Sequence, residues 1–153
     1  MALPGIVKKD PWLAPYSEII STRAKKVLQK EKNLITNHQS ISDFATGYLF
    51  FGMHKSATHW IFREWAPNAE KIYLVGEFSE WKEKPEFLLH SLPYGVWEIM
   101  LPIEAIRHGN LFKLSVYWPG GHGYRLPSYA KRVIQDEKTK NFDAQVWDPD
   151  QPY

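Results

Sequence analysis

The sequence contains no cysteine, which excludes a disulfide framework and any metal site built on thiolates. No apolar run approaches the length of a membrane span, and residues 1–12 lack the charged start and apolar core of a secretory signal. Nor is one charge in excess, because 19 basic and 17 acidic residues leave a net charge of +2 and no long basic tract. We therefore expect no membrane and no nucleic-acid partner. A chain without cysteine also fits the reducing cytosol, so the expected location is cytoplasmic.

The common catalytic motifs are missing as well. No two of the six histidines stand at i, i+4 with an acid between them, so no zinc-type HExxH pattern occurs. The G-x-S-x-G elbow and the glycine-rich phosphate loops are also absent. With 153 residues, the chain is too short for a (β/α)₈ barrel, which typically needs about 250. The sequence thus predicts no catalytic residue, no metal and no cofactor.

Aromatic residues are abundant instead. Seven Trp, eight Tyr and eight Phe make up 15% of the chain. Most must be buried, because aromatic side chains contribute large areas to protein cores. Seven tryptophans in so small a domain still leave one or two for the surface, where a flat ring can hold a ligand.

Residues 1–46 have a helical pattern. Asp10 and Pro11 suit a short helix, with Asp10 as the N-cap and Pro11 in the first position. Residues 16–33 place apolar side chains on one helical face, and Ser17 is a candidate cap. The members of this face are Ile20, Ala24, Val27 and Leu28. A second short helix is expected from Ser40, where "SISD" fits a capping box.

From Gly47 onward the pattern changes to short strands separated by turns. The expected strands cover 47–52, 59–66, 71–76, 94–102 and 111–118, with turns at 67–70 and 119–123. In 111–118, Lys113 alternates with apolar residues and is expected to face outward. This arrangement predicts a mainly β fold, a β-sandwich of the immunoglobulin-like kind preceded by a short N-terminal helical segment. The expected divisions are 1–46, 47–138 and, as an extended connection, 139–153.

Two groups of carboxylates could be considered for glycoside chemistry. A glycosidase needs two carboxyl groups about 5 Å apart, or about 6.5–9.5 Å apart for inversion. Glu77 and Glu80, in "GEFSEW" (76–81), could be that close, but we expect them to be solvent-exposed turn residues. Glu64 lies between Arg63 and Trp65, and its expected role is a buried structural salt bridge rather than catalysis.

Trp81 closes the same stretch in a turn, where packing demands are low. A sugar ring has an apolar face of C–H groups, for which an indole offers a flat surface, and a rim of hydroxyls, for which lysine and amides offer hydrogen bonds. Composition alone favours equally an exposed Trp81 that binds sugar and a Trp81 that closes the end of the sandwich.

Five motifs in order resemble a known family. "FREWAPNAEKIYLVGEFSEW" (62–81) is similar to the start of the family 48 carbohydrate-binding module, with Glu77 and Ser79 in place of Asp and Asn. The others resemble segments of eukaryote-type glucan branching enzymes of glycoside hydrolase family 13. They are "FATGYLFFGMH" (44–54), "YGVWEIMLP" (94–102), "YRLPSYAKRV" (124–133) and "FDAQVWDP" (142–149). "DPWLAPY" (10–16) is similar to the start of the helical segment in the same enzymes.

The resemblance implies an early-set immunoglobulin-like sandwich that binds α-1,4-glucan, such as glycogen, starch or malto-oligosaccharides. In the family, a catalytic barrel with an Asp nucleophile and a Glu acid/base follows shortly after "WDP", and we expect both acids to be absent from this chain. The expected role is to position polymer for that barrel. Related glycogen-binding modules of kinase regulatory subunits imply glucan contacts at Trp81 and Lys113, with Trp118 as a third candidate.

Two other functions are compatible with the motifs. One is a free-standing regulatory or scaffolding glycogen-binding domain, and the other is the leading module of a debranching enzyme. The helical segment and the tail favour a branching enzyme. The tail is rich in apolar residues, among them Phe142, Val146, Trp147 and Tyr153. They predict either weak self-association, through the tail or the face of residues 10–30, or disorder beyond about Asp143.

Overall fold

The computed structural model describes residues 5–34 and 45–149, which belong to two compact units, 1–47 and 48–153. The first unit contains helix α1 (Gly5–Lys9), the 3₁₀ helix η1 (Pro11–Tyr16) and helix α2 (Ser17–Leu34). Asp10 caps η1 as expected, because its Oδ1 accepts a hydrogen bond from the backbone N of Trp12 at 3.1 Å. Ser17 is not the expected N-cap of α2, since it has helical angles (φ −56°, ψ −36°) and α2 continues directly from η1.

The expected apolar face of α2 is exposed within its own unit. Val27 is 66% exposed and Leu28 57%. No helix among residues 5–34 and 45–149 is long and apolar enough to cross a membrane. The short helix expected from Ser40 begins outside the described residues.

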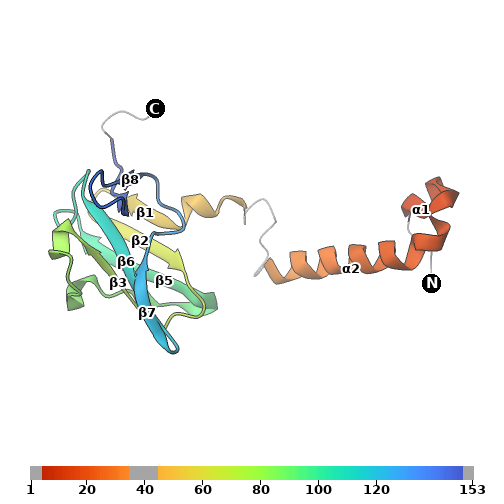
Figure 1. The fold of residues 1–153 in the computed structure, drawn as a ribbon, viewed down its shortest axis with the longest axis horizontal. Coiled ribbons are helices and arrows are strands. Elements are labelled where there is room, and N and C mark those ends of the chain that lie inside the picture. The colour runs from red at the N-terminus through yellow and green to blue at the C-terminus, as the bar shows by residue number, and fades with distance from the viewer. Residues whose placement is uncertain (1–4, 35–44, 150–153) are drawn as a thin grey trace. The chain divides into compact units, whose positions relative to one another are not determined.

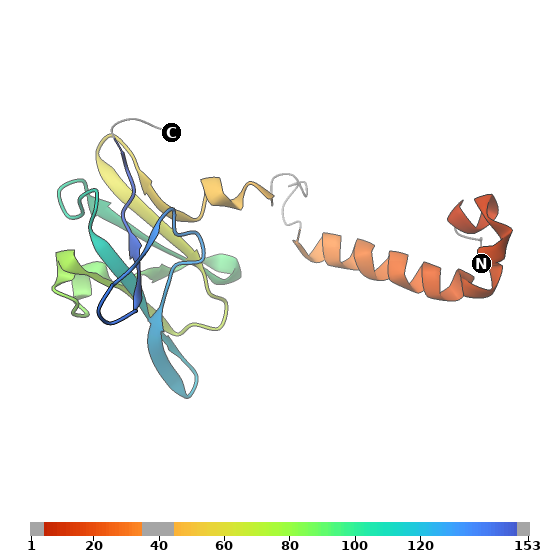
Figure 2. The same ribbon diagram turned by 45° about the horizontal axis from the view of Figure 1, so that its top comes forward.

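The second unit is a sandwich of two antiparallel sheets (Figure 1). One sheet has the order β1-β2-β5-β4, with β1 (Gly52–Lys55), β2 (His59–Trp65), β5 (Val96–Pro102) and β4 (His90–Ser91). The other has the order β3-β6-β9-β8, with β3 (Lys71–Gly76), β6 (Leu111–Trp118), β9 (Phe142–Gln145) and β8 (Val133–Gln135). Strand β7 (Gly121–Arg125) also pairs with β6, and their hairpin extends beyond the other strands (Figure 2). The expected mainly β sandwich, preceded by a helical segment, is confirmed.

Alternating side chains of both sheets fill the core. The inward set includes Trp60, Phe62, Ile72, Leu74, Trp97, Ile99, Leu101, Phe112, Leu114 and Val116. The two buried tryptophans have partners for their polar atoms: the indole N–H of Trp60 donates to the carbonyl of Ile106 at 3.0 Å, and that of Trp97 donates to Ala66 at 3.0 Å. The period-2 pattern therefore determines which face of each strand is left for ligands.

The expected strand 47–52 is wrong for residues 47–51. Gly47–Leu49 form the 3₁₀ helix η2, and β1 starts only at Gly52. Gly52 has a left-handed backbone (φ 89°), and a Cβ there would lie 2.6 Å from the carbonyl oxygen of Tyr129. The turn at Gly52 therefore separates the aromatic residues of 48–51 from strand β1, although the sequence predicted one continuous strand.

The description of 139–153 as an extended connection is wrong for residues 142–145. Phe142–Gln145 form β9, which pairs with β6 and β8, and Ala144 and Val146 are fully buried. The backbone N–H of Asp148 donates to Nδ1 of His108 at 2.9 Å, so the ordered chain continues past the strand. The alternation Ala144, Val146 is the signal for a half-buried strand, and the expected boundary at 138 cuts through the β8–β9 hairpin.

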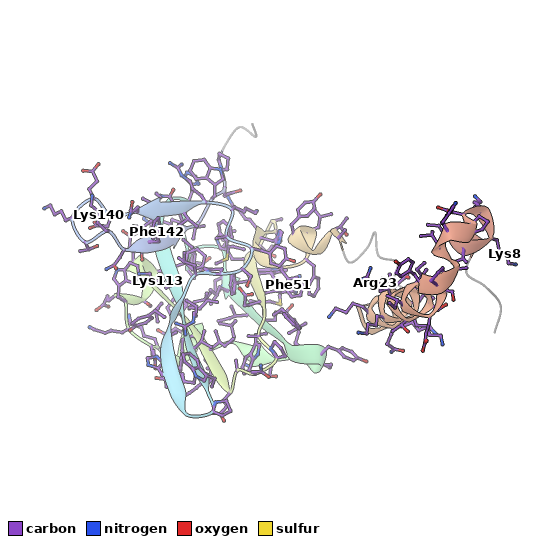
Figure 3. All side chains as sticks on the ribbon, turned by 45° about the vertical axis from the view of Figure 1, so that its right-hand side comes forward. Lys8, Arg23, Phe51, Lys113, Lys140 and Phe142 are labelled. Carbon is purple, nitrogen blue, oxygen red and sulfur yellow. The ribbon has the colours of Figure 1, made fainter. Side chains whose placement is uncertain are left out.

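The expected disorder beyond Asp143 is therefore wrong for residues 144–149, while 150–153 lie outside the described residues. Figure 3 shows Lys140 at the tip of the β8–β9 hairpin and Phe142 next to it on β9. Phe142 is still 51% exposed. Self-association through this part of the tail stays a prediction.

Candidate functional site

Strand β6 has two chemically different faces. Phe112, Leu114 and Val116 point into the core, and the alternate positions carry Lys113, Ser115 and Tyr117. The pairings Val75↔Lys113, Tyr73↔Ser115 and Lys71↔Tyr117 continue this outer face onto β3. We call the surface over β3, β6 and β7 the outer face. The alternation along β6 confirms the expected outward direction of Lys113.

Lys113 is not a free lysine. Its Nζ lies 2.9 Å from Oδ1 of Asp143 on β9, and the two side chains are only 21% and 14% exposed. An ammonium group has three N–H donors, so this ion pair leaves donors for a second acceptor while fixing the position of the side chain.

Trp81 lies in the turn that leaves β3. After the 3₁₀ helix η3 (Glu77–Ser79), Glu80 and Trp81 both have left-handed backbones, with φ of 57° and 59°. The backbone N of Trp81 donates to the carbonyl of Gly76 at 2.8 Å, and the residue is 41% exposed. A bulky residue in this conformation carries strain of about 1–2 kcal/mol. The turn itself thus sets the position of the indole, and its expected contact with glucan stays a prediction.

Ser79 holds this turn together from inside. Its side chain is fully buried, and its Oγ donates to the carbonyl of Gly76 (3.1 Å) and accepts from the Gly76 N–H (3.0 Å). Gly76 is required because a Cβ there would lie 2.4 Å from the carbonyl oxygen of Leu111. Ser79 therefore supports the turn and does not face a ligand.

The carboxylates of this turn are structural, as expected. Glu77 is exposed and accepts hydrogen bonds from Asn110 Nδ2 (3.1 Å) and the Leu111 N–H (3.0 Å). Glu80 accepts from Lys82 and then Lys84, each at 3.0 Å, and these bonds hold the pKa of its carboxyl below the ordinary value. Both groups are thus held by hydrogen bonds to neighbouring residues.

Glu64 is buried as expected, being 4% exposed, but the expected salt bridge is wrong. Its two oxygens accept backbone N–H bonds, from Trp65 at 3.1 Å and Ser128 at 2.9 Å. Among residues 5–34 and 45–149 it has no ion pair, and its neighbour Arg63 pairs with Glu98. Glu64 therefore anchors the 126–130 segment to β2.

A polar cluster that sequence reasoning missed lies on the outer face. Oε1 of Glu83 lies 2.6 Å from Oγ of Ser115, and the hydroxyl of Tyr117 lies 2.9 Å from Oε2. Oγ of Ser115 also lies 2.7 Å from Nε2 of His122. A serine hydroxyl has one hydrogen, which the carboxylate accepts, so Nε2 of His122 must be the protonated nitrogen and donate to Ser115.

Glu83 is shifted by this environment. Partial burial raises the pKa of its carboxyl, but the hydrogen bonds from Ser115 and Tyr117, with the positive charge of Lys71 nearby, outweigh burial and hold the pKa below the ordinary value. The same contact raises the pKa of the Tyr117 hydroxyl. Glu83 therefore stays ionised and fixes the segment 81–83 across the outer face.

Aromatic rings line up beside this cluster. Tyr117 and His122 are stacked with ring centroids 4.2 Å apart, and His122 meets Tyr124 edge-on at 5.9 Å. Tyr124 is 55% exposed. The β6–β7 pairing sets Tyr117 opposite His122 and Ser115 opposite Tyr124. The register of a hairpin with its turn at 119–120 could therefore have predicted that these four side chains lie on one face.

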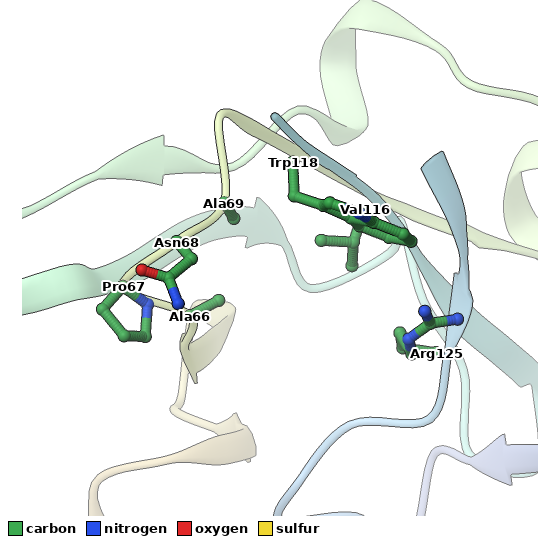
Figure 4. A pocket seen from close by; sticks show the side chains of 7 residues that line it. All are labelled: Ala66, Pro67, Asn68, Ala69, Val116, Trp118 and Arg125. Carbon is green, nitrogen blue, oxygen red and sulfur yellow. The ribbon is translucent and has the colours of Figure 1, made fainter. Parts of the chain in front are cut away.

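Trp118, the third predicted site residue, is not on the outer face. It follows the inward alternation of β6 and packs against the core, where it lines a hollow with Asn68 and Arg125 (Figure 4). Lys113 and Trp118 therefore lie on opposite faces of β6, while Trp81 lies in the turn that leaves β3. No three His, Asp or Glu side chains in the described ranges are grouped as metal ligands would be.

Comparisons with known proteins agree with this architecture. The family model described as "Carbohydrate-binding module 48 (Isoamylase N-terminal domain)" matches residues 50–130. The chain is 34% identical to a 1,4-alpha-glucan-branching enzyme of Dictyostelium discoideum and 36% identical to one of Rhizophagus irregularis. These matches cover 97% and 98% of this chain, which spans about 23% of the length of each relative.

Solved structures support the fold alone. A type I pullulanase from Bacillus subtilis superposes with a TM-score of 0.55 at 17% identity, over 82% of this chain and 15% of the other. A pullulanase from Bacillus acidopullulyticus gives a TM-score of 0.50 at 18% identity, over 64% of this chain and 12% of the other.

Proposed function

The chain belongs to the carbohydrate-binding module 48 family, and from this premise we propose that it binds α-1,4-linked glucans on its outer face. The observation that carries the proposal is Trp81, a partly exposed indole held in a strained turn at the end of β3, the strand that pairs with β6. Strained backbone that a fold retains is enriched at binding sites. A ring presented in this way suits the C–H face of a glucose unit.

The rest of the outer face suits the sugar hydroxyls. Lys113 offers the ammonium donors not used by Asp143, and Tyr124 offers an exposed hydroxyl and a second ring. Glu83 would act as a positioning residue, because its hydrogen bonds fix Tyr117 and the segment that carries Trp81. The face would therefore bind polymer through one or two stacked rings and a few hydrogen bonds.

We further propose that this module works within a 1,4-alpha-glucan branching enzyme, where it positions polymer for a catalytic barrel. The two branching-enzyme matches include the helical segment as well as the sandwich, since they cover 97% and 98% of the chain. A free-standing glycogen-binding domain has little use for that segment.

Binding is tested by electrophoresis in gels that contain glycogen. Loss of one stacked ring should cost about 1–2 kcal/mol, or roughly a five- to thirty-fold loss of affinity. Trp81→Ala should therefore migrate almost as it does without glycogen. Trp12→Ala is the matched control, because Trp12 is 88% exposed in the other unit and should leave retardation unchanged. Equal retardation of the wild type and Trp81→Ala, with both folded by circular dichroism, would exclude Trp81 as the platform.

The catalytic part of the proposal has its own assay. The 153-residue chain should bind amylose without changing the iodine spectrum of the polymer over hours, since branching requires the barrel acids. A blue shift that grows with protein concentration would contradict the assignment of this chain as a binding module.

A further inference from the structure

A hollow of about 310 Å³ lies at one end of the sandwich, away from the outer face. Figure 4 shows the β2–β3 turn on one side of it and Trp118 with Arg125 on the other. Its lining residues are Ala66, Pro67, Asn68, Ala69, Val116, Trp118 and Arg125. The volume is at the lower end of the range for small-ligand pockets, about 300–1,000 Å³.

The edge strand β7 is shaped to receive the indole of Trp118. A Cβ at Gly121 would lie 2.4 Å from the indole Nε1, and a Cβ at Gly123 would lie 3.3 Å from its ring carbon Cη2. The backbone of the two glycines therefore forms a surface without side chains, against which the indole packs. The guanidinium of Arg125 lies 4.8 Å from the ring centroid and completes this surface.

The polar groups of the hollow have unused hydrogen-bonding capacity. Within residues 5–34 and 45–149, neither the Trp118 indole N–H nor the Asn68 amide has a hydrogen-bond partner. Arg125 donates one bond, to the carbonyl of Tyr124 at 2.8 Å, and over the same ranges it has no ion pair. A guanidinium has five donors, so several remain.

These groups define the class of ligand. A partly exposed indole and the small apolar residues Ala66 and Ala69 suit an apolar ring face, while an amide, an indole N–H and a guanidinium suit hydroxyl oxygens around its rim. The lining contains no carboxylate, which would repel those oxygens and compete with them for the guanidinium. A sugar ring has this combination of an apolar face and a polar rim.

We propose that this hollow is a second glucan-binding site, which holds one or two glucose units against Trp118. This proposal rests on the proposed function but concerns a separate surface, because Trp118 and Lys113 project from opposite faces of β6. Two sites on one module would bind one long chain twice, or two chains of the same polymer. Affinity for glycogen would then exceed affinity for a short oligosaccharide without any new contact.

The test is an NMR titration of the indole N–H signals with maltotriose, with Trp81 and Trp118 assigned from Trp→Phe variants. We expect both signals to shift, with separate isotherms. In Trp81→Ala, the Trp118 signal should still shift with an unchanged midpoint. Gly121→Ala should displace the indole and weaken binding in the hollow about five- to thirty-fold, while the Trp81 isotherm stays as in the wild type.

Three outcomes would overturn the second site. The first is a Trp118 signal that stays fixed while the Trp81 signal shifts, which would leave the proposed function intact. The second is a Trp118 shift that disappears in Trp81→Ala, which would make both rings part of one site. The third is a Trp118 shift with inorganic phosphate and none with maltotriose, which would make the hollow an anion site. A shift at Trp118 with none at Trp81 would instead support the hollow and refute the outer-face platform.

Discussion

The left-handed backbone of Trp81 allows the contribution of its ring to be separated from that of its conformation. The comparison is between Trp81→Ala and Trp81→Gly. Both variants lose the indole, but only alanine retains a Cβ, and the cost of φ near 59° with a Cβ is about 1–2 kcal/mol. Glycine relieves that cost. Its greater freedom in the unfolded chain offsets about 0.5–1 kcal/mol of the gain.

The magnitudes follow from burial and strain. A buried Trp covers about 150–250 Å², and with Trp81 41% exposed, roughly 100–150 Å² is covered here. At about 25 cal/mol per Å², losing the ring should lower the free energy of unfolding by at most about 2.5–4 kcal/mol. Trp81→Gly should then be about 0.5–1 kcal/mol more stable than Trp81→Ala, or a few degrees in Tm for a sandwich of roughly 100 residues.

The assay is urea and thermal unfolding of the two variants, followed by retardation in glycogen gels. Trp65 provides the matched control, because it is also partly exposed but lies on strand β2 with an extended backbone. There the order should reverse, with Trp65→Gly less stable than Trp65→Ala. Both Trp81 variants should lose glycogen binding equally. If Trp81→Gly is the less stable of its pair, the backbone at Trp81 is not strained and the argument from strain to function is wrong.

Other contacts give independent tests. Lys113→Ala leaves the carboxylate of Asp143 without its cation and should lower the free energy of unfolding in urea by about 1–3 kcal/mol. The double variant Lys113→Ala/Asp143→Ala should recover part of that loss. If the losses of the two single variants simply add in the double variant, the pair is not coupled. Gly76→Ala should cost about 1–3 kcal/mol or more because its Cβ meets the carbonyl of Leu111, and an unchanged Tm would contradict this contact. The pKa of the Glu83 carboxyl is lower in the folded chain than in the unfolded chain, where it is about 4.3. The ionised group therefore stabilises the fold above about pH 4.3, and this stabilisation is lost as the pH falls through the lower pKa of the folded chain. Glu83→Gln should therefore lose less stability than the wild type between pH 5 and 3, and parallel pH profiles would refute the shift.

The strands with clean alternation could be predicted from the sequence. The faces of β6 follow from the period-2 pattern, so the outward direction of Lys113 was predictable and correct. The same pattern already assigned Trp118 to the inner face, which separates it from Lys113. The sequence prediction grouped them because both positions came from a family resemblance rather than from geometry.

Other parts depended on contacts between distant segments. Residues 142–146 have a short alternation between breakers, and only pairing with β6 and β8 makes them a strand. The cluster of Glu83, Ser115 and His122 joins a loop and a hairpin that no local pattern connects. The left-handed turn at Trp81 has no glycine to signal it, so tertiary contacts override local preference there.

The position of β9 at the end of the described chain has a consequence for folding during synthesis. The pairing of Phe112 with Ala144 spans 32 residues, and the amide of Val146 bonds to the carbonyl of Asn110 at 2.9 Å. A nascent chain that ends before residue 142 contains most of the core side chains, but one edge of β6 near Leu111 still lacks its partner. Such an edge invites pairing with other chains. The last few residues of the sandwich thus decide when a growing chain stops being prone to aggregation.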